Sequence, residues 1–94
     1  MLNKRRSEIE IINQILKLSS NGAKKTEILY QGNLSYLQLQ SYLPYLIEKN
    51  IIEEHMINNN GNSCKLYKTT NKGLNLLEDI NKVILNLKWN LIFF

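Results

Sequence analysis

The sequence is poor in the residues that build covalent or metal crosslinks. Among 94 residues, Cys64 is the only cysteine and His55 is the only histidine. A single cysteine excludes an intramolecular disulfide, and these two residues are too few for a Cys/His zinc site. We therefore expect no disulfide scaffold and no metal, and we interpret Cys64 as a small apolar residue on the inner face of a strand.

The groupings that catalysis and nucleotide binding require are also missing. The four glycines are isolated and form no glycine-rich phosphate loop. The acidic pairs 53–54 and 78–79 are adjacent in sequence, so their side chains point apart on a strand or a helix. His55 is expected to face solvent, opposite the Glu53 side. With no nucleophile beside a base, we predict that the protein is not an enzyme and uses no cofactor.

No apolar run is long enough to cross a membrane. Polar residues interrupt the segment 83–94, which is also shorter than the roughly 20 residues that a bilayer requires. The beginning of the chain is basic at residues 4–6 and does not resemble a signal peptide. We expect a soluble cytoplasmic protein with no membrane partner.

What is present indicates one small globular domain with a basic surface. An apolar share of 44% is ordinary for a folded protein. A chain this short has a modest core, so association with another chain is a reasonable expectation. The net charge of +4 favours a polyanionic partner.

The first predicted helix begins at Ser7. Ser7 and Glu10 form an S-x-x-E capping box, and residues 21–22 end the helix. Apolar residues at helical spacing are predicted to face the core. These are Ile9, Ile12, Leu16 and, at the flank, Ile15.

A second and a third helix are predicted on either side of a tight turn. The second spans about 24–31, with Ile28 and Leu29 as its inward anchors. Residues 32–33 form a Gly-Asn turn, because both residue types tolerate positive φ, and Leu34 fills the core beneath it. The third helix begins at the capping box of Ser35 and Gln38. Its expected buried stripe is Leu39, Leu43, Leu46 and Ile47.

Pro44 lies inside the third helix and is expected to bend it, because proline removes a backbone hydrogen bond. Asn50 is predicted to end this helix in a left-handed conformation. Two strands, 51–57 and 64–69, then form a hairpin around an Asn/Gly-rich loop. The order of helix, turn, helix and hairpin is that of a winged helix-turn-helix, a mainly α fold with a small β-hairpin.

The last predicted helix is capped by Asn71 and runs from about 72 to near the end of the chain. We expect residues 1–70 to be the winged domain and 71–94 to be a dimerisation helix. Up to Ile80 the helix should pack on its own domain; beyond that point it outruns the body, which favours a coiled-coil homodimer. The apolar positions follow spacings of three and four. The predicted seam is Leu77, Ile80, Ile84, Leu87, Leu91 and Phe94.

Polar and basic residues on three elements are candidates for DNA contacts. At the second helix, lysines add charge to a helix N-terminus that can hold a phosphate. On the third helix, Gln can bond an adenine edge, while Ser and Tyr can reach bases or phosphates. The hairpin lysines are suited to phosphate. The candidates are Lys24, Lys25, Thr26, Ser35, Tyr36, Gln38, Gln40, Ser41, Lys65 and Lys68.

The same segments have plainer explanations. A polar helix face is common, and Tyr42 is expected to belong to the core, one turn from Leu39 and Leu46. The predicted recognition helix also has no Lys or Arg before Lys49, so the commonest guanine contact is absent. Sequence specificity is therefore expected to be low or to favour A·T pairs.

Two stretches resemble the small archaeal winged helix-turn-helix DNA-binding proteins. These are KKTEILYQGNLSYLQLQSYLPYLIEKNIIE at 24–53 and YKTTNKGLNLLEDI at 67–80. The resemblance implies a basic, dimeric, DNA-binding protein whose last helices pair as an antiparallel coiled coil. The chain departs from the family at Asn50, where a glycine is usual, and at Pro44.

The leading hypothesis is a homodimer that binds double-stranded DNA as a transcription regulator or a chromatin-like, nucleoid-associated architectural protein. The alternative is a winged helix that contacts another protein and not DNA. The lack of arginine on the third helix and its tyrosines favour that alternative. The sequence leaves open the target site, any effector, the direction of regulation and, from the residues alone, the direction of helix pairing.

Overall fold

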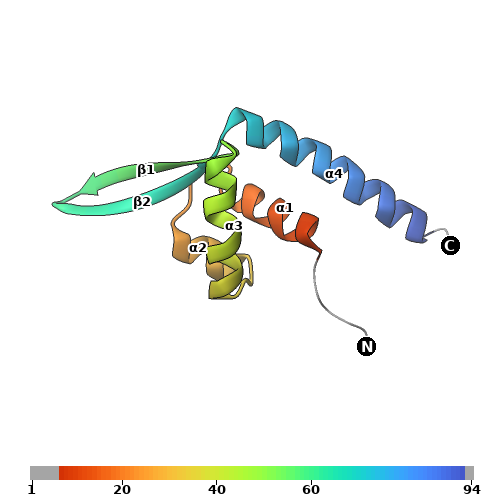
Figure 1. The fold of residues 1–94 in the computed structure, drawn as a ribbon, viewed down its shortest axis with the longest axis horizontal. Helices are drawn as coiled ribbons and strands as arrows, with labels where there is room; N and C mark the ends of the chain where they lie inside the picture. Colours follow the sequence, from red (N-terminus) through yellow and green to blue (C-terminus); the bar gives the residue numbers. More distant parts are fainter. Residues whose placement is uncertain (1–6, 93–94) are drawn as a thin grey trace.

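The protein has the predicted winged-helix architecture. The computed structural model describes the backbone of residues 7–92 and the side chains of residues 7–86. In order, the elements are α1 (Glu8–Leu18), α2 (Lys25–Gln31), α3 (Tyr36–Glu48), β1 (Ile52–Asn59), β2 (Asn62–Thr69) and α4 (Asn71–Ile92). Figure 1 shows α1, α2 and α3 as a helical body, with the hairpin projecting from one side and α4 leading away on the other.

The helix starts follow the predicted local chemistry. At α1 the Ser7 hydroxyl accepts a hydrogen bond from Glu10 N at 3.2 Å, and the Glu10 carboxylate accepts from Ser7 N at 3.0 Å. Ser35 and Gln38 form the same reciprocal pair at α3. Each pair satisfies backbone N–H groups that the helix cannot satisfy itself. The capping boxes are therefore confirmed.

The orientation of α1 differs from the prediction. Ile11, Ile15 and Leu16 are buried, whereas Ile9 is 48% exposed. Several apolar stripes can be drawn on a helix so rich in isoleucine and leucine. Packing of α1 against α2 and α4 selects the stripe through Ile11, so the assignment of Ile9 to the core was wrong.

The turn and the third helix are largely as expected. Leu34 is buried, and Asn33 takes the left-handed conformation with φ 52°, while Gly32 keeps a right-handed φ of −82°. Helix α3 continues through Pro44, and Asn50 has the predicted left-handed φ of 61°. The stripe of α3 lies in the core, with Leu39, Leu43 and Leu46 buried and Ile47 partly buried.

The hairpin is longer and its turn tighter than predicted. The residues assigned to a loop at 58–63 mostly belong to the strands, and Asn59 pairs with Asn62. Only Asn60 and Gly61 form the turn, with φ of 54° and 82°. Positive φ at both central positions is the type I′ geometry, which matches the twist of antiparallel strands. The Asn-Gly pair therefore fixes the register and draws the flanking asparagines into the ladder.

The cap of α4 is Thr70, not the predicted Asn71. Thr70 Oγ1 accepts from Gly73 N at 3.0 Å and donates to the Asn50 carbonyl at 2.7 Å. Asn71 is the first residue of the helix. One hydroxyl thus links the end of α3 to the beginning of α4. Among the described residues, no helix combines the length and apolar character of a bilayer span.

The segment between α1 and α2 is joined to the base of the hairpin. Ala23 and Tyr67 exchange backbone hydrogen bonds of 2.9 and 2.8 Å, and Thr69 N donates to Ser19 O at 2.9 Å. The buried Thr69 hydroxyl donates to Leu16 O at 2.9 Å. These bonds fix the start of α2 beside β2.

Helix α4 packs on the body only over its first part. Leu76 and Leu77 lie against the core and Ile80 is 8% exposed, whereas Val83 is 47% and Leu85 65% exposed. The predicted change at Ile80 agrees with the described residues. Of the predicted seam, the side chains of Leu87, Leu91 and Phe94 lie outside them.

Gly73, in the first turn of α4, lies so close to Ile51 and Thr69 that there is no room for a side chain. This close contact gives a test of how α4 packs on the winged domain. A Cβ at this position would overlap the Ile51 carbonyl oxygen and lie 2.6 Å from Thr69 Cγ2. Alanine normally favours a helix over glycine by about 1 kcal/mol, but overpacking against backbone costs about 1–3 kcal/mol. We expect Gly73→Ala to lower the free energy of unfolding measured in urea. The exposed Asn75→Ala on the same helix should not lower it.

Candidate nucleic-acid interface

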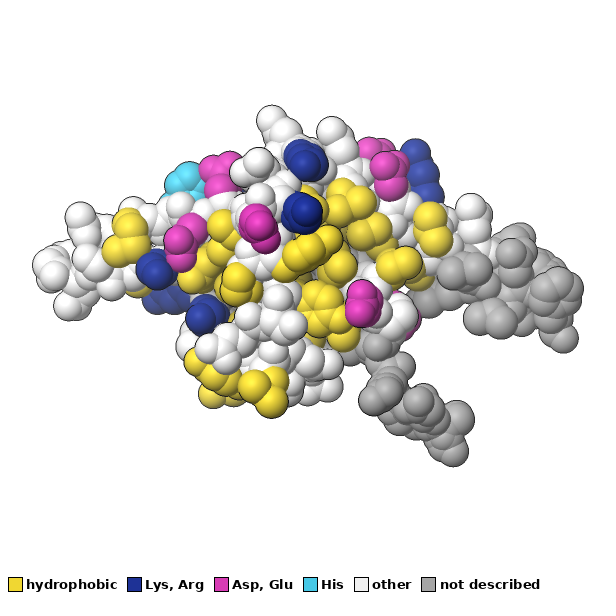
Figure 2. Space-filling model, viewed as in Figure 1, with side chains coloured by type: hydrophobic (Ala, Val, Ile, Leu, Met, Phe, Trp, Pro, Cys, Tyr) yellow, Lys and Arg dark blue, Asp and Glu magenta, His cyan; other side chains and the backbone are white. Residues whose placement is uncertain are grey.

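Three predicted lysines converge where the hairpin meets the helical body. Lys24, Lys25 and Thr26 are exposed at the start of α2. They line a shallow hollow of about 380 Å³ together with residues of β2, namely Cys64, Lys65 and Tyr67. Figure 2 shows lysine side chains, in dark blue, near this junction. The Ala23–Tyr67 bridge brings the two lysine groups together, although they are far apart in sequence.

A negative charge, that of Glu54, lies beside two of the residues that line this hollow. Lys65 Nζ lies 3.3 Å from Glu54 Oε2, which also accepts a hydrogen bond from the Tyr67 hydroxyl at 3.1 Å. Burial, and secondarily Glu54, raises the pKa of Tyr67, so this phenol is a neutral donor at physiological pH. Glu54 therefore partly neutralises the charge of Lys65. Lys24 and Lys25 are less neutralised by acidic neighbours than Lys65 is.

The N-terminus of α2 already holds a carboxylate. Glu27 Oε1 accepts from Lys24 N at 2.7 Å. An acidic group in the first turn occupies the positive end of a helix. The lysine side chains are therefore better placed than this helix end to attract an anion.

Lys68 is separated from the other lysines. It stands three residues from Lys65 on one strand, so the two point to opposite faces of the hairpin. Lys68 lines a different hollow with Asn21, His55 and Leu66 among others. On this strand pair His55 Nε2 lies 2.6 Å from Glu53 Oε1, so the expectation that His55 faces away from Glu53 was wrong. Residues i and i+2 share one face of a strand, which explains the pairing.

The polar candidates on α3 divide into engaged and free groups. The Ser35 hydroxyl accepts from Gln38 N at 3.1 Å, and Gln38 Oε1 accepts from Ser35 N at 2.9 Å. These side-chain atoms of both residues are therefore already engaged in capping the N-terminus of α3. Tyr36, at 58% exposure, and the exposed Gln40 and Ser41 are turned to solvent.

The exposed face of α3 carries a residue that the sequence interpretation missed. Leu37 is 76% exposed, the second most exposed large apolar residue of the described chain after Tyr30 at 78%. Its offset from the buried stripe of Leu39, Leu43 and Leu46 was the signal that could have found it. Figure 2 shows hydrophobic side chains at the lower end of the helical body, on the same face as the lysines at the hairpin junction.

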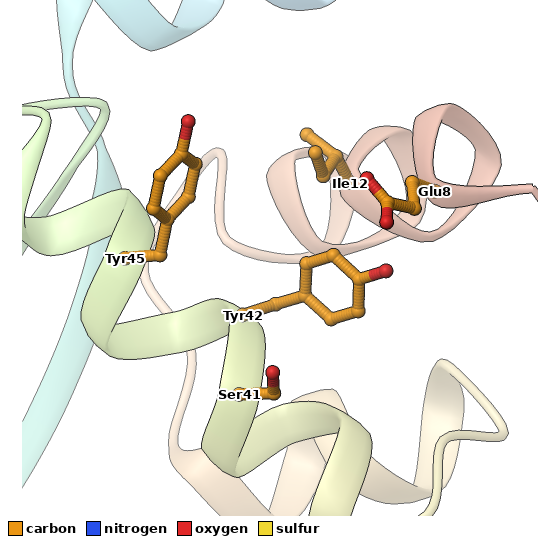
Figure 3. A pocket seen from close by; sticks show the side chains of 5 residues that line it. All are labelled: Glu8, Ile12, Ser41, Tyr42 and Tyr45. Carbon is orange, nitrogen blue, oxygen red and sulfur yellow. The ribbon is translucent and has the colours of Figure 1, made fainter.

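A second hollow separates α1 from α3. It measures about 420 Å³ and is lined by Glu8, Ile12, Ser41, Tyr42 and Tyr45. Figure 3 shows Glu8 and Ile12 of α1 facing the two tyrosines of α3. Tyr42 packs against the core as predicted, and burial, then the charge of Glu8, raises its pKa. Lys49 Nζ lies 5.6 Å from the Tyr45 ring centre, a cation–π distance.

Among the described residues, no group of three or more His, Cys, Asp or Glu side chains could hold a metal ion. Cys64 is a free, partly buried thiol in the lysine-lined hollow.

Comparison with known families gives one model, described as winged helix-turn-helix, that matches residues 5–88. An uncharacterized protein from Methanocaldococcus jannaschii is 36% identical over 80 residues, which cover 84% of this chain and 34% of that protein. The chain thus spans about a third of the length of this relative.

Solved structures share the fold. Sso10a-2, a DNA-binding protein from Sulfolobus solfataricus, has a TM-score of 0.74 and 26% identity, with 93% of this chain and 86% of that one covered. A PadR-like transcriptional regulator from Bacillus cereus has a TM-score of 0.75 and 20% identity, with 88% and 90% covered. The second similarity shows the fold alone.

The capping role of Ser35 can be separated from any role in binding. Loss of an N-cap hydroxyl costs about 1 kcal/mol. We expect Ser35→Ala to lower the free energy of unfolding by about that amount. Ser41→Ala, which removes an exposed hydroxyl on the same helix, should leave it unchanged. Equal denaturation midpoints for the two variants would contradict the cap.

Proposed function

Because the chain belongs to the winged helix-turn-helix family, we propose that it binds double-stranded DNA as a homodimer. The observation that carries this proposal is the group formed by Lys24, Lys25 and Lys65, together with the exposed polar residues in the N-terminal half of α3. Cations on the same helix-turn-helix and hairpin unit as the third helix suit a duplex, because phosphates flank the groove that such a helix enters. The DNA-binding description of Sso10a-2 supports the same function.

In this proposal each element has one task. Helix α3 enters the major groove with Tyr36, Gln40 and Ser41 toward the bases. Lys24 and Lys25 neutralise phosphates on one flank, and Thr26 can add a hydroxyl contact. The hairpin lies along the neighbouring backbone, with Lys65 on the side of α2 and Lys68 on the other face.

Charge reversal tests the lysine contacts. Each neutralised phosphate contributes about 0.9 to the slope of log affinity against log salt. We expect Lys24→Glu with Lys25→Glu to abolish retardation of duplex DNA at moderate salt and to reduce the slope by about 2. The matched control is Lys17→Glu with Lys82→Glu, which makes the same change in net charge at exposed positions on α1 and α4. Equal loss in both double variants would mean that only net charge matters.

The homodimer is proposed from the exposed apolar surface of α4. Beyond Ile80 the helix presents Val83 and Leu85 to solvent, with Ile84 only partly covered. Exposed apolar residues repeated along a helix are usually buried by a partner. We propose that residues 71–94 form the dimerisation unit, apart from the winged domain of 1–70. Leu77 and Ile80 already touch their own core, so the intermolecular part of the seam begins after them.

Sedimentation tests the seam. Ile84→Asp places a carboxylate in the proposed interface, where an unpaired buried charge is strongly unfavourable. We expect analytical ultracentrifugation to show a dimer for the wild type and a monomer for this variant. Asn81→Asp, an exposed position on the same helix, should remain dimeric. An unchanged sedimentation coefficient for Ile84→Asp would contradict the proposed seam.

A protein-binding winged helix is the second candidate. It is favoured by the exposed Tyr30, Tyr36 and Leu37 and by the absence of Lys or Arg within α3. The lysine reversal distinguishes the two, because it should remove DNA binding and leave an apolar protein contact largely intact.

Under the DNA proposal the protein acts in the cytoplasm, at the nucleoid, as a regulator or an architectural protein. The similar solved structures are a DNA-binding protein and a PadR-like transcriptional regulator, and they give no reason to propose an enzyme.

A further inference from the structure

The outward face of α3 is unusual for a helix that enters a DNA groove. From Tyr36 to Glu48 it contains no Lys or Arg. Its acidic residue, Glu48, is exposed at the C-terminal end. A carboxylate there opposes close approach of phosphates, so the N-terminal half of α3 is the part suited to enter a groove.

That N-terminal half presents an apolar side chain next to two polar ones. Leu37 is 76% exposed. Gln40 and Ser41 lie three and four residues further along and are also exposed. Side chains at i, i+3 and i+4 are neighbours on one helix surface. Leu37, Gln40 and Ser41 therefore form one outward surface, which we call the Leu37 face.

The chemistry of this face matches one base pair in the major groove. An A·T pair presents the N6 and N7 atoms of adenine, which an amide can bond twice, beside the C5-methyl group of thymine. A G·C pair has no methyl group and is read most often by arginine, which α3 does not contain. A leucine beside a glutamine thus complements A·T.

The surroundings favour a duplex over an apolar protein groove as the occupant. The lysines at 24, 25 and 65 lie on the same helix-turn-helix and hairpin unit and provide charge complementary to phosphates. Figure 2 shows cationic side chains near the hairpin junction and hydrophobic side chains at the lower end of the helical body, on one face of the molecule.

We propose that Leu37 is a specificity-determining residue that reads thymine through its C5-methyl group, while Gln40 bonds the adjacent adenine. The inference rests on the proposed DNA binding and deepens it by naming the preferred substrate, a duplex rich in A·T pairs. Preference for A·T then comes from burial of apolar surface and from uncharged hydrogen bonds, and not from a charged contact.

Replacing thymine by uracil tests the methyl contact, since uracil keeps every hydrogen-bonding group and lacks only the methyl. Affinity is measured by fluorescence anisotropy for two duplexes of A·T pairs, one with thymine and one with uracil. We expect the wild type to bind the thymine duplex more tightly, by about fourfold for each methyl that Leu37 covers. Leu37→Ala should bind both duplexes equally.

Two controls separate the contributions. Leu74→Ala removes a partly exposed leucine from α4 and should keep the full preference for thymine. Gln40→Ala should weaken binding to both duplexes and keep the thymine-to-uracil ratio. The wild type should bind a G·C duplex that contains 5-methylcytosine more tightly than the same duplex without the methyl groups. Leu37→Ala should bind the methylated and unmethylated G·C duplexes equally.

The outcomes distinguish this inference from the proposed function. If the wild type binds thymine and uracil duplexes equally, the methyl contact is refuted while DNA binding stands. If Leu37→Ala still binds the thymine duplex more tightly than the uracil duplex, another residue makes the methyl contact and the proposed role of Leu37 is refuted. If the wild type binds no duplex even at low salt, the proposed function itself fails and this inference with it.

Discussion

The rest of the structure depends on the hydrogen bonds that join β2 to the segment between α1 and α2. Ala23 and Tyr67 exchange two backbone bonds, and Thr69 bonds to Ser19 through its amide and to Leu16 through its buried hydroxyl. A buried polar group without a partner is costly, so these bonds strongly favour one position for the hairpin. That position places Lys65 beside the start of α2.

The fixed position of the hairpin base also determines where the candidate lysines lie on the surface. Because the hairpin base is fixed and strands alternate their faces, Lys65 lies in the hollow with Lys24 and Lys25, while Lys68 lines another. Three of the candidate lysines therefore lie together on α2 and the hairpin, whereas α3 contains no Lys or Arg. Under the proposed DNA binding, phosphate contacts would come from the lysines and base contacts from α3.

Local features of the fold were predictable from sequence because they depend on neighbouring residues. The capping boxes at Ser7 and Ser35, the left-handed Asn50 and the order of elements are confirmed. The resemblance to small archaeal winged-helix DNA-binding proteins is confirmed as well. Features set by contacts between distant parts of the chain were not predictable. Packing against α2 and α4 buries the face of α1 that contains Ile11, and the hydrogen bond to Asn50 holds Thr70 where it caps α4. The DNA and dimer contacts stay predictions.

The most direct measurement of the central claim is an amide NMR titration of the ¹⁵N-labelled protein with a short A·T-rich duplex. If the duplex binds as proposed, the largest shift changes map to 24–26, to the first two turns of α3 and to β2 near Lys65, with little change along Glu8–Leu18. Changes confined to α1 and α4, with α3 unaffected, would show that the duplex meets another surface and would contradict the account.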